Sequence, residues 1–172
     1  MILWILLAIL FVYLDQITKY LAVIFLKGEP SFPLIKEVLH FTYVENRGAA
    51  FGMLKEHRWV FMVISTVAIV ALTAYLWMHR KEHWLQSLSL SMLIGGGIGN
   101  MIDRIVLGYV IDFVDFTLID FAVFNIADTF VCVGVALLIF YLVMSMIKIS
   151  KEEARAKELA DNSETAKTDA EE

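Results

Sequence analysis

Four apolar segments constrain this chain more than any other feature of its sequence. A helix needs about 20 predominantly apolar residues to cross the hydrocarbon core of a bilayer. Segments of this kind cover residues 1–26, 59–78, 84–107 and 121–147. The chain is 59% hydrophobic and has a mean hydropathy of +0.71, more than an ordinary soluble domain carries. The sequence therefore predicts an all-α membrane protein, with one membrane domain over residues 1–147 built as a bundle of four transmembrane helices.

The distribution of Lys and Arg predicts how the four segments are oriented. Arg80 and Lys81 lie between the second and third segments, and three more basic residues follow the fourth segment within 148–155. Cytoplasmic loops are enriched in these residues, so we expect both termini in the cytoplasm and the loop around Asp112 outside. Residues 148–172 hold five Lys/Arg and eight Asp/Glu. We expect this charged tail to be disordered.

Charge and histidine spacing argue against two classes of partner. The net charge is −5, and no run of the chain is basic enough to suggest a nucleic-acid surface. The sequence contains no His-Glu-x-x-His motif, and its histidines are split between two loops. They are His40, His57, His79 and His83. We therefore expect no nucleic-acid partner, no metal and no cofactor.

The first loop carries a β-strand pattern. After the turn-forming residues Gly28, Pro30 and Pro33, residues 38–44 are rich in aromatic and β-branched side chains. This composition predicts a short strand or hairpin within about 28–57, on the outer surface of the membrane.

Polar side chains from separate parts of the chain fall at one predicted depth. A helix rises about 1.5 Å per residue, so position along each segment gives approximate depth. Near the outer face this places Asp15, Lys19, Asn46, Asn100, Asp103, Arg104, Asn125 and Asp128. Buried polar groups need partners, so this convergence predicts one polar cluster.

Two aspartates of this outer region point to hydrolytic chemistry. Asp112 follows Gly-Tyr-Val-Ile, and Asp128 follows Phe-Asn-Ile-Ala just before a long apolar stretch. Ionisable residues at membrane depth are costly and usually mark function. Two carboxylates at close range share a proton, so one acts as a base on water while the other acts as an acid. This pattern suggests hydrolysis within or at the edge of a membrane.

Two further motifs allow more than one interpretation. Asp15 and Lys19 are four residues apart and can pair on one helix face, either as a structural ion pair or as substrate contacts. The glycine-rich run 95–99 lacks the spacing of a nucleotide-binding loop, because Asn100 stands where a glycine is needed. Glycines in an apolar segment instead allow close helix packing or close approach of a substrate.

Four blocks of sequence, in order, resemble the lipoprotein signal peptidase family, also called signal peptidase II. They are 15–19 (Asp-Gln-Ile-Thr-Lys), 46–52 (Asn-Arg-Gly-Ala-Ala-Phe-Gly), 99–113 (from Gly-Asn-Met-Ile-Asp-Arg to Gly-Tyr-Val-Ile-Asp-Phe) and 124–128 (Phe-Asn-Ile-Ala-Asp). The stretch between the last two blocks, 114–123, is shorter than we expect in relatives, which bears on substrate contacts more than on catalysis.

The resemblance implies a four-helix membrane bundle with a small β-rich cradle on its outer face. It implies an aspartic endopeptidase of the bacterial plasma membrane, with its active site at the outer leaflet and no cofactor. Its substrate would be a prolipoprotein, cut just before a cysteine that carries diacylglycerol, and it would contact membrane lipid. The family's catalytic pair falls on Asp112 and Asp128. Its supporting positions fall on Asp15, Lys19, Asn46, Gly48, Asn100, Arg104 and Asn125.

Two other functions remain open from the residues alone. A small proton-coupled transporter also uses carboxylates at membrane depth, although here the polar groups gather at one level and do not trace a path across the bilayer. A non-enzymatic assembly factor would use the polar cluster only to hold its helices together.

Overall fold

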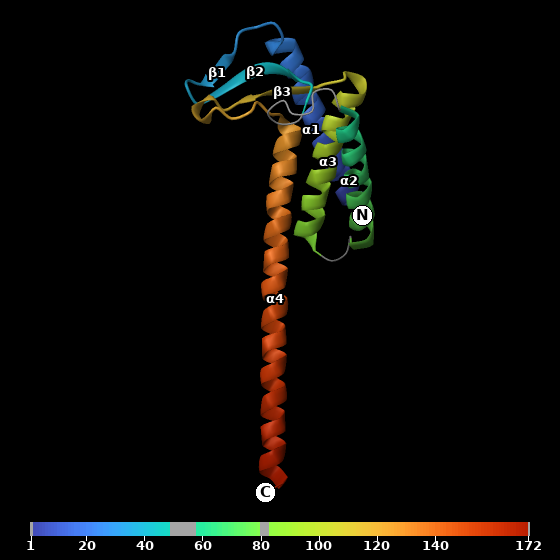
Figure 1. The fold of residues 1–172 in the computed structure, drawn as a ribbon, viewed down its shortest axis with the longest axis vertical. Helices are drawn as coiled ribbons and strands as arrows, with labels where there is room; N and C mark the ends of the chain where they lie inside the picture. Colours follow the sequence, from blue (N-terminus) through green and yellow to red (C-terminus); the bar gives the residue numbers. More distant parts are fainter. Residues whose placement is uncertain (1, 49–57, 80–82, 172) are drawn as a thin grey trace.

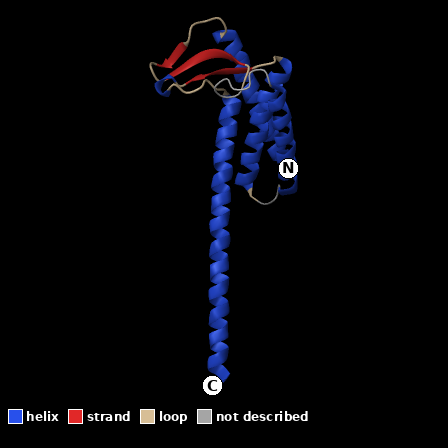
Figure 2. Ribbon diagram, in the orientation of Figure 1, coloured by secondary structure: helices blue, strands red, loops and turns tan. Residues whose placement is uncertain are grey.

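The computed structural model describes residues 2–48, 58–79 and 83–171 as long helices capped by a small sheet (Figures 1 and 2). The elements are α1 (Ile2–Leu26), β1 (Phe32–Ile35), β2 (Leu39–Asn46), α2 (Arg58–His79), α3 (Trp84–Val106), β3 (Val110–Asp115), the 3-10 helix η2 (Thr117–Ile119) and α4 (Ile126–Glu171). Residues 49–57 of the expected cradle, together with Arg80 and Lys81, lie outside the described residues.

Helix α3 packs against the three other helices, and its glycines make this possible. A methyl group at Gly95 would meet Ala8 and Phe11 of α1, and one at Gly96 would meet the main-chain oxygen of Ala127 in α4. Gly97 faces α2 instead. Each glycine of the run 95–97 therefore places a residue without a side chain against a different neighbouring helix, as expected of glycines that allow close helix packing.

Three helices of the described residues are long and apolar enough to cross a membrane: α1, Met62–His79 of α2, and Ile126–Lys157 of α4. The expected span at 84–107 does form a helix, but α3 is not among these three. The reason lies in its polar side chains, which include Gln86, Ser87 and Asn100 and are buried against the neighbouring helices. Polar residues in such a position are shielded from lipid.

The sheet lies across one end of the helices, and both ends of the chain lie away from it (Figure 1). Its strands are antiparallel in the order β1-β2-β3. The strand expected within 28–57 is confirmed as β1 and β2, whereas β3 was not expected. Ile111 and Phe113 of β3 are buried in a cluster with Ala22 of α1, which fixes the sheet to the helices.

Two expected boundaries differ from the structure. The fourth segment does not begin at residue 121, because α4 begins at Ile126 and Phe124 instead exchanges main-chain hydrogen bonds with Val114 of β3 (2.8 and 3.0 Å). An apolar residue there completes the sheet edge. The tail at 148–172, expected to be disordered, is instead helical and continues α4 to Glu171. Its Ala, Glu and Lys residues are strong helix formers.

The glycine contacts predict the effect of adding a methyl group. Gly96→Ala places a Cβ 2.5 Å from the Ala127 main-chain oxygen, so it should lower the stability of the bundle by about 1–3 kcal/mol. The measurement is thermal unfolding in detergent. Gly97→Ala is the matched control, because its Cβ meets only the flexible side chain of Ile69, at 3.2 Å. Equal midpoints for both variants would contradict this account of the packing.

Candidate active site

The start of α4 places Asp128 through a reciprocal cap. Asn125 is the residue before the helix, and its Oδ1 accepts the main-chain N–H of Asp128 at 2.9 Å. The Asp128 Oδ2 in turn accepts the main-chain N–H of Asn125 at 3.2 Å. This arrangement is a capping box, which satisfies two N–H groups that a helix start leaves without partners. It fixes the Asp128 side chain in the first turn, where the helix dipole favours negative charge.

Strand β3 places Asp112 opposite this cap. The chain leaves α3 through Gly108, whose φ of +84° is a left-handed conformation that glycine adopts readily. Asp112 then pairs in register with Val44 of β2 and is only 2% exposed. Its Oδ1 accepts the Asn125 Nδ2 at 2.6 Å, and its Oδ2 accepts the Asn46 Nδ2 at 2.9 Å. The carboxylate is therefore held from two directions.

Two asparagine side chains join the two aspartates. Asn100 of α3 donates its Nδ2 to Asp128 Oδ1 at 2.8 Å. Its Oδ1 accepts the Nδ2 of Asn125 at 3.0 Å, and the same Nδ2 reaches Asp112. Asp112, Asn125, Asn100 and Asp128 thus form one continuous chain of hydrogen bonds. Residues that are far apart in sequence meet here because β3, α3 and the start of α4 converge.

The remaining expected site residues surround this chain. Gly48 donates its main-chain N–H to Asn46 Oδ1 at 3.0 Å, which turns the Asn46 amide toward Asp112. Arg104 is half-buried and donates to the main-chain oxygen of Asn100 at 3.3 Å. Lys19 donates to the Asn100 Oδ1 at 2.8 Å. The structure therefore brings every residue of the expected site into one region.

Asp15 and Lys19 form the ion pair that their spacing predicts, with Nζ and Oδ2 2.8 Å apart. The same ammonium contacts Asp103 at 3.0 Å, and Gln16 donates to Asp103 Oδ1 at 3.0 Å. Sequence reasoning placed Asp103 at the right depth but gave it no site role, and it did not select Gln16. The signal available for Gln16 was its position inside the block at 15–19.

The environment of Asp112 changes its proton affinity. Burial raises its pKa to about 6, with the negative charge of Asp128 acting in the same direction. Hydrogen bonds from Asn46 and Asn125 and the positive charge of Lys19 act the other way and favour the carboxylate. Asp112 therefore keeps its proton to a higher pH than an isolated aspartate does.

A pocket of about 300 Å³ opens beside the polar chain, between α2, α3 and α4. Asn100, Arg104 and Asp128 line its polar end. The rest of its wall is mainly apolar and includes Ala68, Ile69, Leu72, Leu93 and Val131. Among the residues that the structure describes, no group of three or more His, Cys, Asp or Glu side chains lies in an arrangement that could hold a metal ion. The arrangement can therefore place a mostly apolar ligand against Asp128, which the hydrogen-bonded chain joins to Asp112.

Comparison with known proteins identifies relatives over most of the chain. The family model described as signal peptidase (SPase) II matches residues 7–144. A lipoprotein signal peptidase of Caldanaerobacter subterraneus subsp. tengcongensis is 48% identical over 133 residues, covering 77% of this chain and 90% of that protein. One from Clostridioides difficile is 44% identical over 140 residues, covering 81% and 94%.

Two solved structures share the fold. A bacterial membrane enzyme determined by the in meso method at 2.3 Å resolution superposes with a TM-score of 0.75 and 35% identity, covering 83% of this chain and 88% of that one. A second, at 1.9 Å resolution, gives a TM-score of 0.71 and 36% identity, covering 81% and 91%. With a family model matched from residue 7 to residue 144 and these relatives beside it, the chain belongs to the signal peptidase II family.

Proposed function

We propose that Asp112 and Asp128 are the catalytic aspartates with which this peptidase removes the signal peptides of prolipoproteins. The observation that carries the proposal is the hydrogen-bonded chain from Asp112 through Asn125 and Asn100 to Asp128. It holds the two carboxyl groups in fixed relation, and one of them, that of Asp128, lines the polar end of a pocket. As in the family, the cut falls just before the cysteine that carries diacylglycerol. The named relatives are peptidases, and nothing among them supports the transporter hypothesis.

In the proposed reaction the two aspartates divide the acid and base roles. Asp128 lies in the first turn of α4, where the helix dipole favours a carboxylate, so it takes a proton from the attacking water. Asp112 is the buried member and begins protonated. As the water oxygen bonds to the scissile carbonyl carbon, Asp112 donates a hydrogen bond to the developing oxyanion. The leaving amine is then protonated by the pair, the carbon–nitrogen bond breaks, and both aspartates return to their starting states.

The pocket beside Asp128 suits the apolar part of the substrate. Its polar end carries Asp128, while Ala68, Ile69 and Val131 form part of an apolar wall. A diacylglyceryl group supplies binding free energy of roughly 0.8 kcal/mol for each buried methylene. Selectivity for lipidated precursors follows if this energy is needed to bring the scissile bond to the aspartates.

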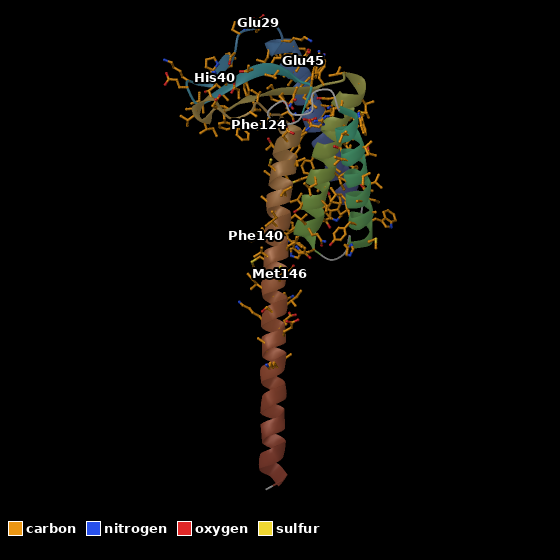
Figure 3. The ribbon with its side chains drawn as sticks, in the orientation of Figure 1. Glu29, His40, Glu45, Phe124, Phe140 and Met146 are labelled. Carbon is orange, nitrogen blue, oxygen red and sulfur yellow. The ribbon has the colours of Figure 1, made fainter. Side chains whose placement is uncertain are left out.

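In the membrane, we propose that all four helices span the bilayer, with α3 shielded by the other three. Phe140 and Met146 project from α4 and are 56% and 70% exposed, as expected of side chains that face lipid (Figure 3). Both chain ends lie away from the sheet (Figure 1), in keeping with cytoplasmic termini. The sheet and the aspartates then lie at the outer leaflet of the bacterial plasma membrane.

A cleavage assay tests the proposed function. The purified chain in detergent is mixed with a diacylglyceryl-modified prolipoprotein and, separately, with its unmodified precursor. We expect processing of the lipidated form and little or none of the unmodified form, because the lipid supplies the binding free energy. Failure of the folded protein to cleave the lipidated precursor would overturn the proposal, and equal cleavage of both would refute the role given to the lipid.

Replacing either aspartate tests the catalytic assignment. Asp112→Asn and Asp128→Asn keep the shape of the side chain, but each replaces one acceptor oxygen by an NH2 group and cannot exchange the required proton. Each should lower the rate of processing by about 10²–10⁴-fold, the approximate contribution of general acid–base catalysis, while the variant remains folded and unfolds cooperatively on heating in detergent. Asp115→Asn, on the same strand, is the matched control and should retain activity. A variant that loses stability and activity together would favour the assembly-factor interpretation.

The pKa of Asp112 predicts a pH dependence. The reaction needs its proton, which the free enzyme holds below about pH 6 and loses as pH rises through that value. We therefore expect kcat/KM to fall on the alkaline side of about pH 6, and kcat to fall at a higher pH because bound substrate adds to the burial.

The same measurement on Asn46→Ala supplies the decisive comparison. Removing this donor withdraws a hydrogen bond that lowers the pKa of Asp112, so the alkaline limb of kcat/KM should move to higher pH. Thr42→Val, which removes a hydrogen bond to Asp115 between the same two strands, should leave the limb in place. A limb that does not respond to Asn46→Ala would contradict the assignment of the proton to Asp112.

A further inference from the structure

Two buried carboxylates outside the catalytic pair each bind the main-chain N–H that directly precedes a catalytic aspartate. Asp15 Oδ1 accepts the N–H of Ala127 at 2.9 Å, one residue before Asp128. Asp103 Oδ2 accepts the N–H of Ile111 at 3.1 Å, one residue before Asp112. In each case a carboxylate fixes the main-chain N–H of the residue that directly precedes the proposed catalytic aspartate. The two contacts come from different helices, α1 and α3.

A single ammonium group ties these two carboxylates together. Lys19 Nζ lies 2.8 Å from Asp15 Oδ2 and 3.0 Å from Asp103 Oδ2. Its third contact is the Asn100 Oδ1, at 2.8 Å. A lysine ammonium has three donors, so these acceptors use all of them. Gln16 adds a second bridge, because its Nε2 lies 3.2 Å from Asp15 Oδ2 and 3.0 Å from Asp103 Oδ1.

The buried ion cluster, defined as Asp15, Lys19 and Asp103, is closed to a substrate. The exposed fractions are 0%, 2% and 3%. Gly99 closes the approach further, because a Cβ there would overlap the Asp15 carboxylate, and its main-chain oxygen accepts Gln16 Nε2 at 3.2 Å. Groups so enclosed do not contact a substrate, so they act on the reaction through the residues that they hold and, for Lys19, through its charge.

We propose that the buried ion cluster is a positioning device, which sets the separation of Asp112 and Asp128 by holding the main chain just before each of them. This inference rests on the proposed function, because it takes those two residues as the catalytic pair. Lys19 fixes Asp15 relative to Asp103, and these in turn fix the start of α4 relative to β3. Under this proposal Asp15 and Lys19 are a structural pair, the first of the two alternatives that their spacing leaves open. Asp103 and Gln16 join them as positioning residues.

Kinetic constants of cluster variants separate positioning from substrate contact. A displacement of about 1 Å at reacting groups costs on the order of 10²-fold in rate. Asp15→Asn and Asp103→Asn should therefore lower kcat by roughly 10- to 100-fold and leave KM for the lipidated precursor within about twofold. A substrate contact would instead raise KM. Asp115→Asn is again the control and should change neither constant.

Two further variants keep the test meaningful if removal of a charge unfolds the protein. Gly99→Ala retains every charge of the cluster but displaces the Asp15 carboxylate, and it should show the same loss of kcat. The double variant Asp15→Asn/Lys19→Met removes one negative and one positive charge, so the net charge of the cluster is unchanged. Its loss of kcat should be much smaller than the product of the losses in Asp15→Asn and Lys19→Met, because the residues act as a unit.

Hydrogen exchange gives a readout that does not depend on activity. Asp15→Asn should speed amide exchange around Ala127, and Asp103→Asn around Ile111, with each effect confined to its own side of the pair. If the wild type fails to cleave lipidated precursor, the proposed function fails, but the exchange measurement still tests the cluster. Unchanged exchange at both amides, or a raised KM with unchanged kcat, would overturn the positioning role.

Discussion

Among the described residues, the buried charged and amide side chains around Asp112 and Asp128 are paired, because removing such a group from water costs several kcal/mol when it finds no partner. Lys19, Asp15 and Asp112 are almost fully buried, and all three have partners. These partners come from α1, α3, α4 and the sheet. None of the four can move without leaving a polar group unpaired, so the relative placement of the elements and the geometry of the aspartates are set together.

Much of this region could be predicted from the sequence by one argument. Positions along the apolar segments place polar residues at a common depth, and the structure joins Asn100, Asn125 and Asp128 in one hydrogen-bonded chain. The structural role of Asp103 could not be predicted from the sequence. Its partner is the main-chain N–H of Ile111, and a main-chain group has no signature in sequence.

Some elements of the fold follow from the local sequence, whereas others depend on pairing with residues that are far away in the chain. Hydropathy predicted α2 at 59–78, and the helix runs from Arg58 to His79. It did not predict β3 or the late start of α4, because the apolar residues of 110–124 look the same in a strand, a loop or a helix. Their state depends on pairing with β2, more than 60 positions earlier in the chain in the case of Val44 and Asp112. The prediction of a disordered tail rested on its charged composition. The helix propensity of its residues instead favours the continuation of α4.

The reciprocal cap between Asn125 and Asp128 has a consequence for how this enzyme can change over time. Residues held for catalysis usually cost a protein stability, so replacing them tends to make the fold sturdier at the expense of activity. Here the same carboxylate forms one half of the capping box at the start of a long helix, where it accepts the main-chain N–H of Asn125. On the proposed assignment of Asp128 as a catalytic residue, an apolar replacement there loses both the cap and the catalytic carboxylate, and no gain in stability offsets the loss of activity. Selection for a sound fold and selection for a working enzyme therefore preserve the same atom.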